Sequence, residues 1–130
     1  MPEGKADALG RILRELQEST PEIAACAVSS LDGFIIASRL PPSVNEDGVG
    51  ALSAALHSVA EKVAKDMGRG GVEQIVVKGE SGYLVTVAIS RDAILTAIAP
   101  QDATVGLVIL RMKKCAEEIV RVVGPLSGEL

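Results

Sequence analysis

The sequence predicts an α/β (α+β) domain of three layers (α/β/α), in which helices cover both faces of a central five-stranded antiparallel sheet. Three observations predict this class. Segments with apolar residues at helical spacing alternate with short apolar runs of strand length, in the order αββαβββα. The last three runs are separated only by turn-length segments, which favours an antiparallel meander. Both faces of that meander are apolar, so we expect helices on both sides of the sheet.

The composition fits one domain over residues 1–130. A chain of 130 residues, 48% of them hydrophobic, can fill one core. Its apolar runs fall short of the roughly 20 residues that cross a bilayer. The amino-terminal segment lacks the apolar stretch of a secretory signal. We therefore expect no membrane insertion and a cytoplasmic location.

The first element is a helix over about residues 6–17. Its apolar residues recur at the i, i+3, i+4 and i+7 positions that form one stripe of an amphipathic helix. They are Leu9, Ile12, Leu13 and Leu16. The helix is expected to end before Pro21.

An Asp-Gly pair between two apolar runs predicts a β-hairpin. We expect its strands at about residues 23–30 and 34–38, with Asp32 and Gly33 at the turn, where glycine supplies a positive φ. Asp32 could instead be a catalytic carboxylate. That role needs a partner base, acid or metal ligand, and the sequence offers no convincing one. The turn interpretation is therefore favoured.

A long helix is expected over about residues 45–67. Ser43 and Glu46 have the spacing of a capping box, in which a hydroxyl and a carboxylate bind the first free amides of a helix. An apolar stripe follows at steps of three and four residues, and the glycines within residues 68–71 end the helix. The stripe consists of Val49, Leu52, Leu56, Val59, Val63 and Met67.

Three strands and a last helix complete the domain. The strands are expected at about residues 72–78, 83–89 and 93–99, each an apolar run bounded by turn residues. The helix is expected over about residues 103–123, where apolar residues again step by three and four until Gly124.

No catalytic, cofactor or metal set is apparent. His57, the only histidine, lies on the side of the long helix away from the apolar stripe, so we expect a solvated surface residue. Cys26 and Cys115 are far apart in the sequence and lack the C-x-x-C spacing of metal or redox sites. The glycine clusters lack the Lys-Ser/Thr of a phosphate-binding loop. We therefore expect a protein that is not an enzyme and acts by contact.

Charge and aromatic content argue against nucleic acid and flat organic ligands as partners. With 13 Lys+Arg against 17 Asp+Glu, the net charge is -4 and no basic cluster is present, which argues against nucleic acid. Phe34 and Tyr83 are the only aromatic residues, so the chain offers no stacking platform for bases and few rings for a flat organic ligand.

The long helix carries small residues opposite its apolar stripe. They are Ala51, Ala54, Ala55 and Ser58. Small side chains allow a second helix to approach closely, but alanine is also the best helix former and could be present for that reason alone. Both interpretations stay open from the sequence.

The strand over residues 72–78 suggests a second contact. If this strand lies at the sheet edge, its free amides and carbonyls need a cover, and pairing with a second copy across a two-fold axis would supply one. We therefore expect a homodimer with one continuous sheet. Its interface would use the small residues of the long helix together with Val72, Gln74, Ile75, Val76 and Val77.

The element order and three segments resemble the roadblock/dynein light chain family. The segments are "VSSLDGFIIA" across the first hairpin, "GYLVTVAIS" in the meander and "ATVGLVILRMKKCAEEI" in the last helix. The resemblance covers nearly the whole chain and is greatest to prokaryotic single-domain members, of which the regulator of the gliding-motility GTPase is one. It implies the first and third helices on one sheet face, the long helix on the other, and dimerisation through the strand after it.

The resemblance further implies binding of a small Ras-like GTPase over the paired long helices, with an effect on its hydrolysis or nucleotide exchange. The expected contacts are His57, Ser58, Glu61, Lys62 and Lys65. The resemblance implies that the protein acts by ordering the switch loops of the GTPase. An arginine finger from Arg39 or Arg69 is disfavoured. One alternative is a structural adaptor that changes no rate. Another is a small-ligand sensor. The scarcity of aromatic residues and the lack of buried polar residues disfavour this alternative.

Overall fold

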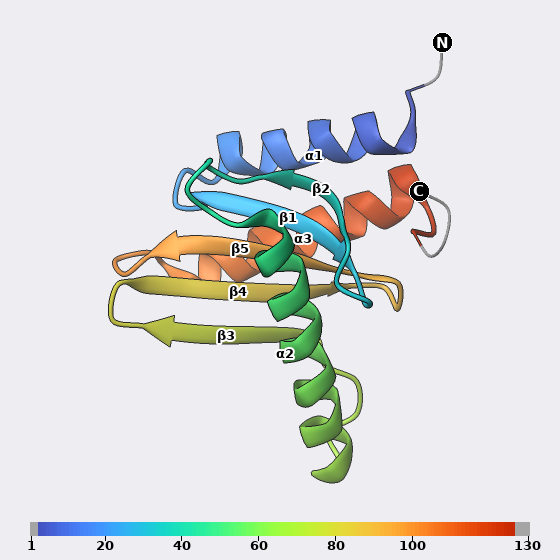
Figure 1. The fold of residues 1–130 in the computed structure, drawn as a ribbon, viewed down its shortest axis with the longest axis vertical. Coiled ribbons are helices and arrows are strands. Elements are labelled where there is room, and N and C mark those ends of the chain that lie inside the picture. The colour runs from blue at the N-terminus through green and yellow to red at the C-terminus, as the bar shows by residue number, and fades with distance from the viewer. Residues whose placement is uncertain (1–2, 127–130) are drawn as a thin grey trace.

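The computed structural model describes residues 3–126 and confirms the predicted fold class (Figure 1). The elements are α1 (Lys5–Ser19), β1 (Ala25–Ser30), β2 (Ile35–Arg39), α2 (Glu46–Asp66), β3 (Gln74–Gly79), β4 (Gly82–Ile89), β5 (Ala93–Pro100) and α3 (Val105–Val123). The strands form one sheet in the order β2-β1-β5-β4-β3, with every neighbouring pair antiparallel. β2 and β3 are therefore the edge strands.

The main core lies between the sheet and the helices α1 and α3, which run side by side on one face (Figure 1). Burying one large aliphatic side chain contributes about 1.5–3 kcal/mol, so this layer supplies most of the hydrophobic stabilisation. The fully buried side chains of the two helices include Leu9, Ile12, Leu13, Met112 and Ile119. Their partners in the sheet include Val28, Val85, Val87 and Leu95.

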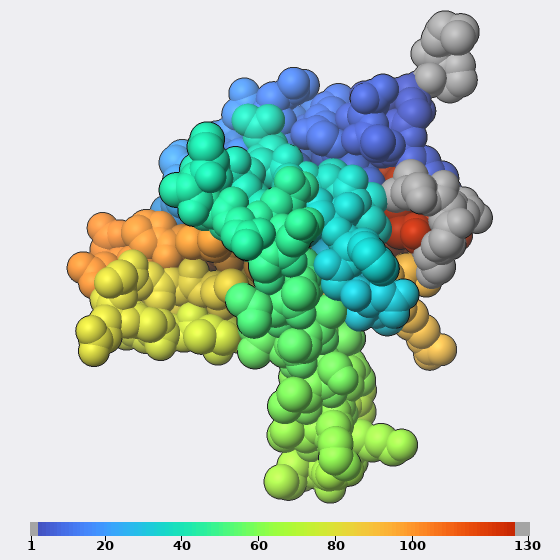
Figure 2. Space-filling view, in the orientation of Figure 1, coloured from blue at the N-terminus to red at the C-terminus, as the bar shows by residue number. Residues whose placement is uncertain are grey.

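α2 covers the opposite face of the sheet through small residues. Gly50 and Ser53 are its buried residues. The sheet beneath also presents small side chains, and the Oγ of Ser53 lies 2.8 Å from Oγ1 of buried Thr96 in a hydrogen bond. Small residues on both surfaces let the helix lie close to the strands. The carboxyl-terminal half of α2 then extends beyond β3, clear of the sheet (Figures 1 and 2).

The Asp-Gly pair forms the turn of the first hairpin, as predicted. Gly33 has φ of 92°, in the left-handed region that glycine adopts readily, and its amide donates to the carbonyl of Ser30. The turn also packs against α2. A Cβ added to Gly50 would lie 2.4 Å from the carbonyl oxygen of Gly33, so the contact requires glycine at residue 50. The turn thereby fixes the start of α2.

The predicted capping box is wrong. Asn45 is the N-cap of α2, and its Oδ1 accepts from the amide of Gly48 at 3.1 Å. Glu46 instead accepts from the hydroxyl of Ser38 at 3.0 Å. Because Asn caps helices as well as Ser does, the helix starts two residues later than a box from Ser43 would place it.

Two strands start two residues later than predicted. β1 begins at Ala25, because the amide of Ile23 still donates to Thr20 in a turn. β3 begins at Gln74, after a connection that leaves α2 at Met67.

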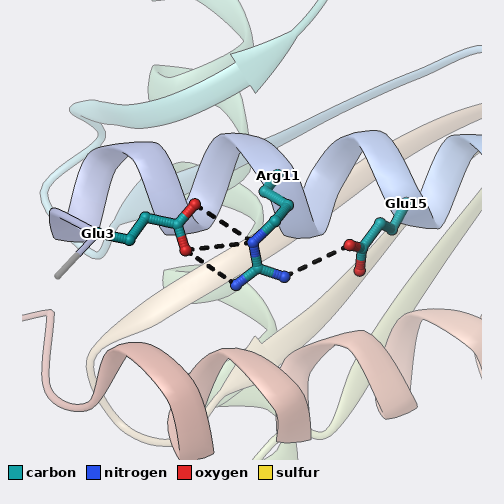
Figure 3. Close-up of polar contacts among 3 residues, drawn as sticks. All are labelled: Glu3, Arg11 and Glu15. Atoms are coloured by element: carbon teal, nitrogen blue, oxygen red, sulfur yellow. Dashed lines mark hydrogen bonds and ion pairs between the residues drawn. The ribbon is translucent and has the colours of Figure 1, made fainter. Parts of the chain in front are cut away.

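An ion-pair network lies along α1, close to α3 and separated from α2 by the sheet (Figure 3). Arg11 bridges Glu3 at 3.1 Å and Glu15 at 3.4 Å. The hydrogen bond from Arg11 to Glu3, more than any other contact, raises the pKa of the Arg11 guanidinium above its ordinary value. Exposed pairs of this kind contribute little to stability, so we assign the network no functional role.

Candidate functional site

The apolar stripe of α2 faces solvent, which corrects the expected orientation of this helix. The sequence places the small residues of α2 on its outer face, yet it is small residues, led by Gly50 and Ser53, that contact the sheet. Four of the six stripe residues are left uncovered, with Leu52 65%, Val59 64%, Val63 53% and Met67 66% exposed. The other two, Val49 and Leu56, are half-buried. Exposed rows of large apolar side chains are typical of interaction surfaces, so the stripe is a candidate site.

The predicted small-residue face does not exist as one surface. Ala54 is half-buried against the body of the domain, whereas Ala51, Ala55 and Ser58 point to the outer side and are exposed. The reason is the turn of the helix: Gly50, Ser53, Ala54 and His57 occupy i, i+3, i+4 and i+7, and this set lies toward the sheet.

The predicted GTPase contacts separate into two groups. Ser58, Lys62 and Lys65 are exposed on the outer side of α2. His57 is not the solvated residue expected, since its side chain is only 17% exposed. Glu61 is half-buried, and its carboxylate accepts from the amide of Val72 at 2.9 Å.

Glu61 and His57 therefore belong to the joint between α2 and β3. The two side chains approach to 3.6 Å between Oε1 of Glu61 and Nε2 of His57. The carboxylate accepts from an amide just before β3 and so fixes the path of the chain from α2 into that strand. Sequence reasoning missed this role, because the helical periodicity of Glu61 does not reveal which backbone amide it meets.

β3 is an edge strand, as the dimer hypothesis requires. Val76 and Val77 are 41% and 42% exposed. The amide of Ala88 donates to the carbonyl of Glu73, which makes these two residues a hydrogen-bonded pair. Because such pairs alternate along an antiparallel ladder, Ile75 directs its amide to β4 while Val76 directs its amide to the open edge.

The stripe and the open edge lie near each other. Ile75 and Val77 face the same side of the sheet as Thr86, the side that α2 covers. The overhanging half of α2 passes the end of β3 (Figure 2). A second copy bound at the β3 edge could therefore also reach the stripe.

The two candidate arginines differ in position. Arg39 donates from Nε to Oε1 of Gln17 at 2.7 Å, so it is held beside the end of α1, away from the stripe. Arg69 follows α2 and is exposed. Within residues 3–126, no group of three or more His, Cys, Asp or Glu could hold a metal ion.

The cysteines are buried in the core, and burial raises the pKa of Cys26 to about 11 and that of Cys115 to about 12. Both thiols are therefore protonated at neutral pH, when a thiol is a poor nucleophile. Within the described part of the chain, no helix is long and apolar enough to span a membrane.

Comparisons with known proteins identify the family. The Roadblock/LC7 domain model matches residues 9–99. The uncharacterised protein MJ1340 of Methanocaldococcus jannaschii is 36% identical over 111 residues, covering 85% of this chain and 96% of that protein. MJ0310 of the same organism is 35% identical over the same shares.

Solved structures show the same fold. Myxococcus xanthus MglB has a TM-score of 0.84 at 19% identity, covering 94% of this chain and 92% of that one. The gliding protein MglB of Thermus thermophilus has a TM-score of 0.83 at 20% identity, covering 95% and 93%. A Roadblock/LC7 domain from Streptomyces avermitilis has a TM-score of 0.79 at 23% identity, covering 86% and 93%. The chain belongs to the Roadblock/LC7 domain family.

Proposed function

We propose that this protein is a non-enzymatic homodimeric regulator that binds a small Ras-like GTPase through its paired α2 helices and modulates hydrolysis or nucleotide exchange. The observation that carries the proposal is the uncovered apolar stripe of α2 beside the open β3 edge, on a fold shared with MglB gliding proteins.

Dimerisation would satisfy both exposed features together. Pairing β3 with its copy gives each outward amide, such as that of Val76, a carbonyl partner. The same two-fold axis brings the overhanging α2 of one protomer toward the sheet of the other. Its stripe would then be removed from water, which is the main favourable contribution to association.

The GTPase would bind the outer side of the paired helices. This side keeps Ala51, Ala55, Ser58, Lys62 and Lys65 exposed, and small residues with two lysines permit close approach by a partner bearing acidic groups. The partner would act by holding switch loops in one conformation. Arg39 is held by Gln17, which supports this route over an arginine finger.

Two measurements test the proposal. Light scattering at micromolar concentration is expected to give twice the mass of the chain, and a monomer would refute the dimer. A Ras-like GTPase co-purified from the protein's own cells is then assayed for hydrolysis and exchange.

The double variant Lys62→Glu, Lys65→Glu should weaken GTPase binding without changing the dimer, while Lys114→Glu on α3 should leave both unchanged. Arg69→Ala should not abolish stimulation of GTP hydrolysis.

A structural adaptor is the second candidate function. Its support is that the described surface offers contacts but no group that must take part in a reaction. The same assay separates the two: a GTPase that binds α2 while its hydrolysis and exchange rates stay constant would favour the adaptor.

A further inference from the structure

A cleft of about 600 Å³ lies beside α2, on the flank away from the apolar stripe. Ala54, His57, Ser58 and Glu61 line it from the helix. At about 100° per residue, these positions lie roughly 170° around the helix from the stripe. The cleft therefore lies away from the stripe, although it shares Ser58 with the outer side of α2 and Val72 with the expected dimer interface. The inference drawn from it requires neither a dimer nor a GTPase.

The cleft has the mixed lining of a small-molecule site. Leu31, Val72 and Ala93 supply apolar wall, while His57, Ser90 and Arg91 supply polar groups. Small-molecule sites are typically concave, mostly apolar, and about 300–1,000 Å³ in volume, with a few polar groups that fix orientation. The sequence had disfavoured a ligand site because it showed no buried polar residues, and the largely buried His57 changes that premise.

Two charged side chains line the cleft, Glu61 and Arg91. Glu61 is already engaged, since its carboxylate accepts from the amide of Val72 at 2.9 Å and lies 3.6 Å from Nε2 of His57. Arg91 is exposed and has no hydrogen bond or ion pair among residues 3–126. Its guanidinium therefore has free donors, and their planar arrangement fits a carboxylate with two parallel hydrogen bonds.

Ser90 holds an unusual backbone conformation at the same place. Its φ of 55° makes it the one non-glycine residue with positive φ in the described chain. Such conformations are unfavourable for residues with a Cβ and collect at binding sites, where the surrounding structure maintains them. Here the strained residue lies directly before Arg91 in the β4–β5 turn and also lines the cleft.

We propose that this cleft binds a small carboxylate with a short apolar body. The carboxylate pairs with Arg91, next to the hydroxyl of Ser90, and the apolar body lies against Leu31, Val72 and Ala93. Either a free metabolite or the carboxyl-terminal residue of another protein presents this chemistry.

The test is an NMR titration of the ¹⁵N-labelled protein with isovalerate and with its neutral analogue 3-methylbutan-1-ol. Isovalerate should give saturable shifts confined to amides around the cleft, with a dissociation constant of about 1 mM, as expected for so small a ligand. The alcohol should bind at least about tenfold more weakly, because it lacks the charge that Arg91 recognises. Equal affinity for the alcohol, or no saturable shift, would overturn the proposal.

Variants assign the effect to the cleft. Arg91→Gln should weaken isovalerate binding about tenfold or more, whereas Arg121→Gln on the exposed side of α3 should leave it unchanged. Unaltered binding by Arg91→Gln would also overturn the proposal. N-acetylvaline and its amide identify the source: stronger binding of the acid than of isovalerate indicates a protein terminus, and weaker binding indicates a metabolite. The amide should not bind.

Discussion

At the scale of single residues, the packing of α2 against the first hairpin depends on Gly50 having no Cβ. Gly50 approaches the carbonyl of Gly33 so closely that one added carbon has no room. Beside this contact, Ser53 and Thr96 share a buried hydrogen bond. α2 is therefore fixed to the hairpin turn by close backbone packing and to β5 by this buried polar pair.

Gly50→Ala should destabilise the protein by about 1–3 kcal/mol, because the new methyl group forces the hairpin turn away from the helix. Chemical denaturation measures the change. Gly106→Ala is the matched control, since that glycine lies in α3 and a Cβ there meets nothing within 4 Å. The control should be neutral or stabilising by up to about 1 kcal/mol. Equal behaviour of the two variants would contradict the close packing at Gly50.

The buried thiols predict a loss of stability at alkaline pH. Burial raises the pKa of Cys26 from its ordinary value of 9.0 to about 11, so between these values the unfolded chain has lost a proton that the folded chain keeps. Stability from this group is complete below pH 9.0 and falls as the pH rises toward 11, by about 1 kcal/mol at pH 10. Urea unfolding across this range should show a smaller decline for Cys26→Ala than for wild type. Identical slopes would count against the buried thiol as a cause.

At the scale of elements, the sequence predicted every helix and strand but assigned the wrong face of α2 to the sheet. Periodicity shows that Leu52, Val59 and Val63 share a side, yet it cannot show which partner covers that side. The usual assumption is that the largest apolar face is internal. Here the sheet under α2 presents Thr96 beside the buried Ile94, and the helix packs on it through Gly50 and Ser53 instead. The spacing of those small residues was the one available indication.

Other parts of the candidate site depend on long-range contacts. The edge position of β3 and its strand pattern were within reach of sequence reasoning, since they follow from local patterns and a family resemblance. The joint between Glu61 and Val72 was not, because it joins a side chain to a backbone amide 11 residues later. The cleft at Arg91 also escaped prediction, as it forms only when α2, the first hairpin and the β4–β5 turn come together.

Two proline variants of β3 should have different effects. Ile75→Pro removes an amide that is directed to β4, so it should destabilise the protomer by about 3 kcal/mol or more. Val76→Pro removes an amide directed to the open edge, so it should leave the folded protomer largely intact and reduce dimerisation. Circular dichroism and analytical ultracentrifugation distinguish these outcomes. If Val76→Pro dimerises like wild type, the edge is not the interface.

At the scale of the whole molecule, the α2 overhang leaves apolar surface that the protomer itself does not cover. The layer between α1, α3 and the sheet is closed, whereas the stripe and the β3 edge are open on the other face. Stability should therefore depend on association as well as on the protomer core.

The melting temperature should rise with protein concentration, because dimer formation stabilises the folded state by mass action. Val59→Glu places a charge in the stripe and should abolish this dependence while leaving the protomer folded. Lys65→Glu introduces the same side chain on the outer side of α2 and should retain the dependence. Differential scanning fluorimetry over a hundredfold range of concentration makes the comparison. A wild-type melting temperature that is independent of concentration would contradict this dependence of stability on association.

The sheet-contacting residues of α2 and its apolar stripe lie on different sides of the same helix, and this has an evolutionary consequence. Changes at Gly50 or Ser53 alter the packing of the protomer itself, whereas changes at Leu52, Val59 or Val63 alter only the exposed surface of the helix. After gene duplication, two copies could diverge along the stripe and cease to recognise each other while each still folds. Selective pairing among duplicates could thus arise on this helix without loss of stability in either descendant.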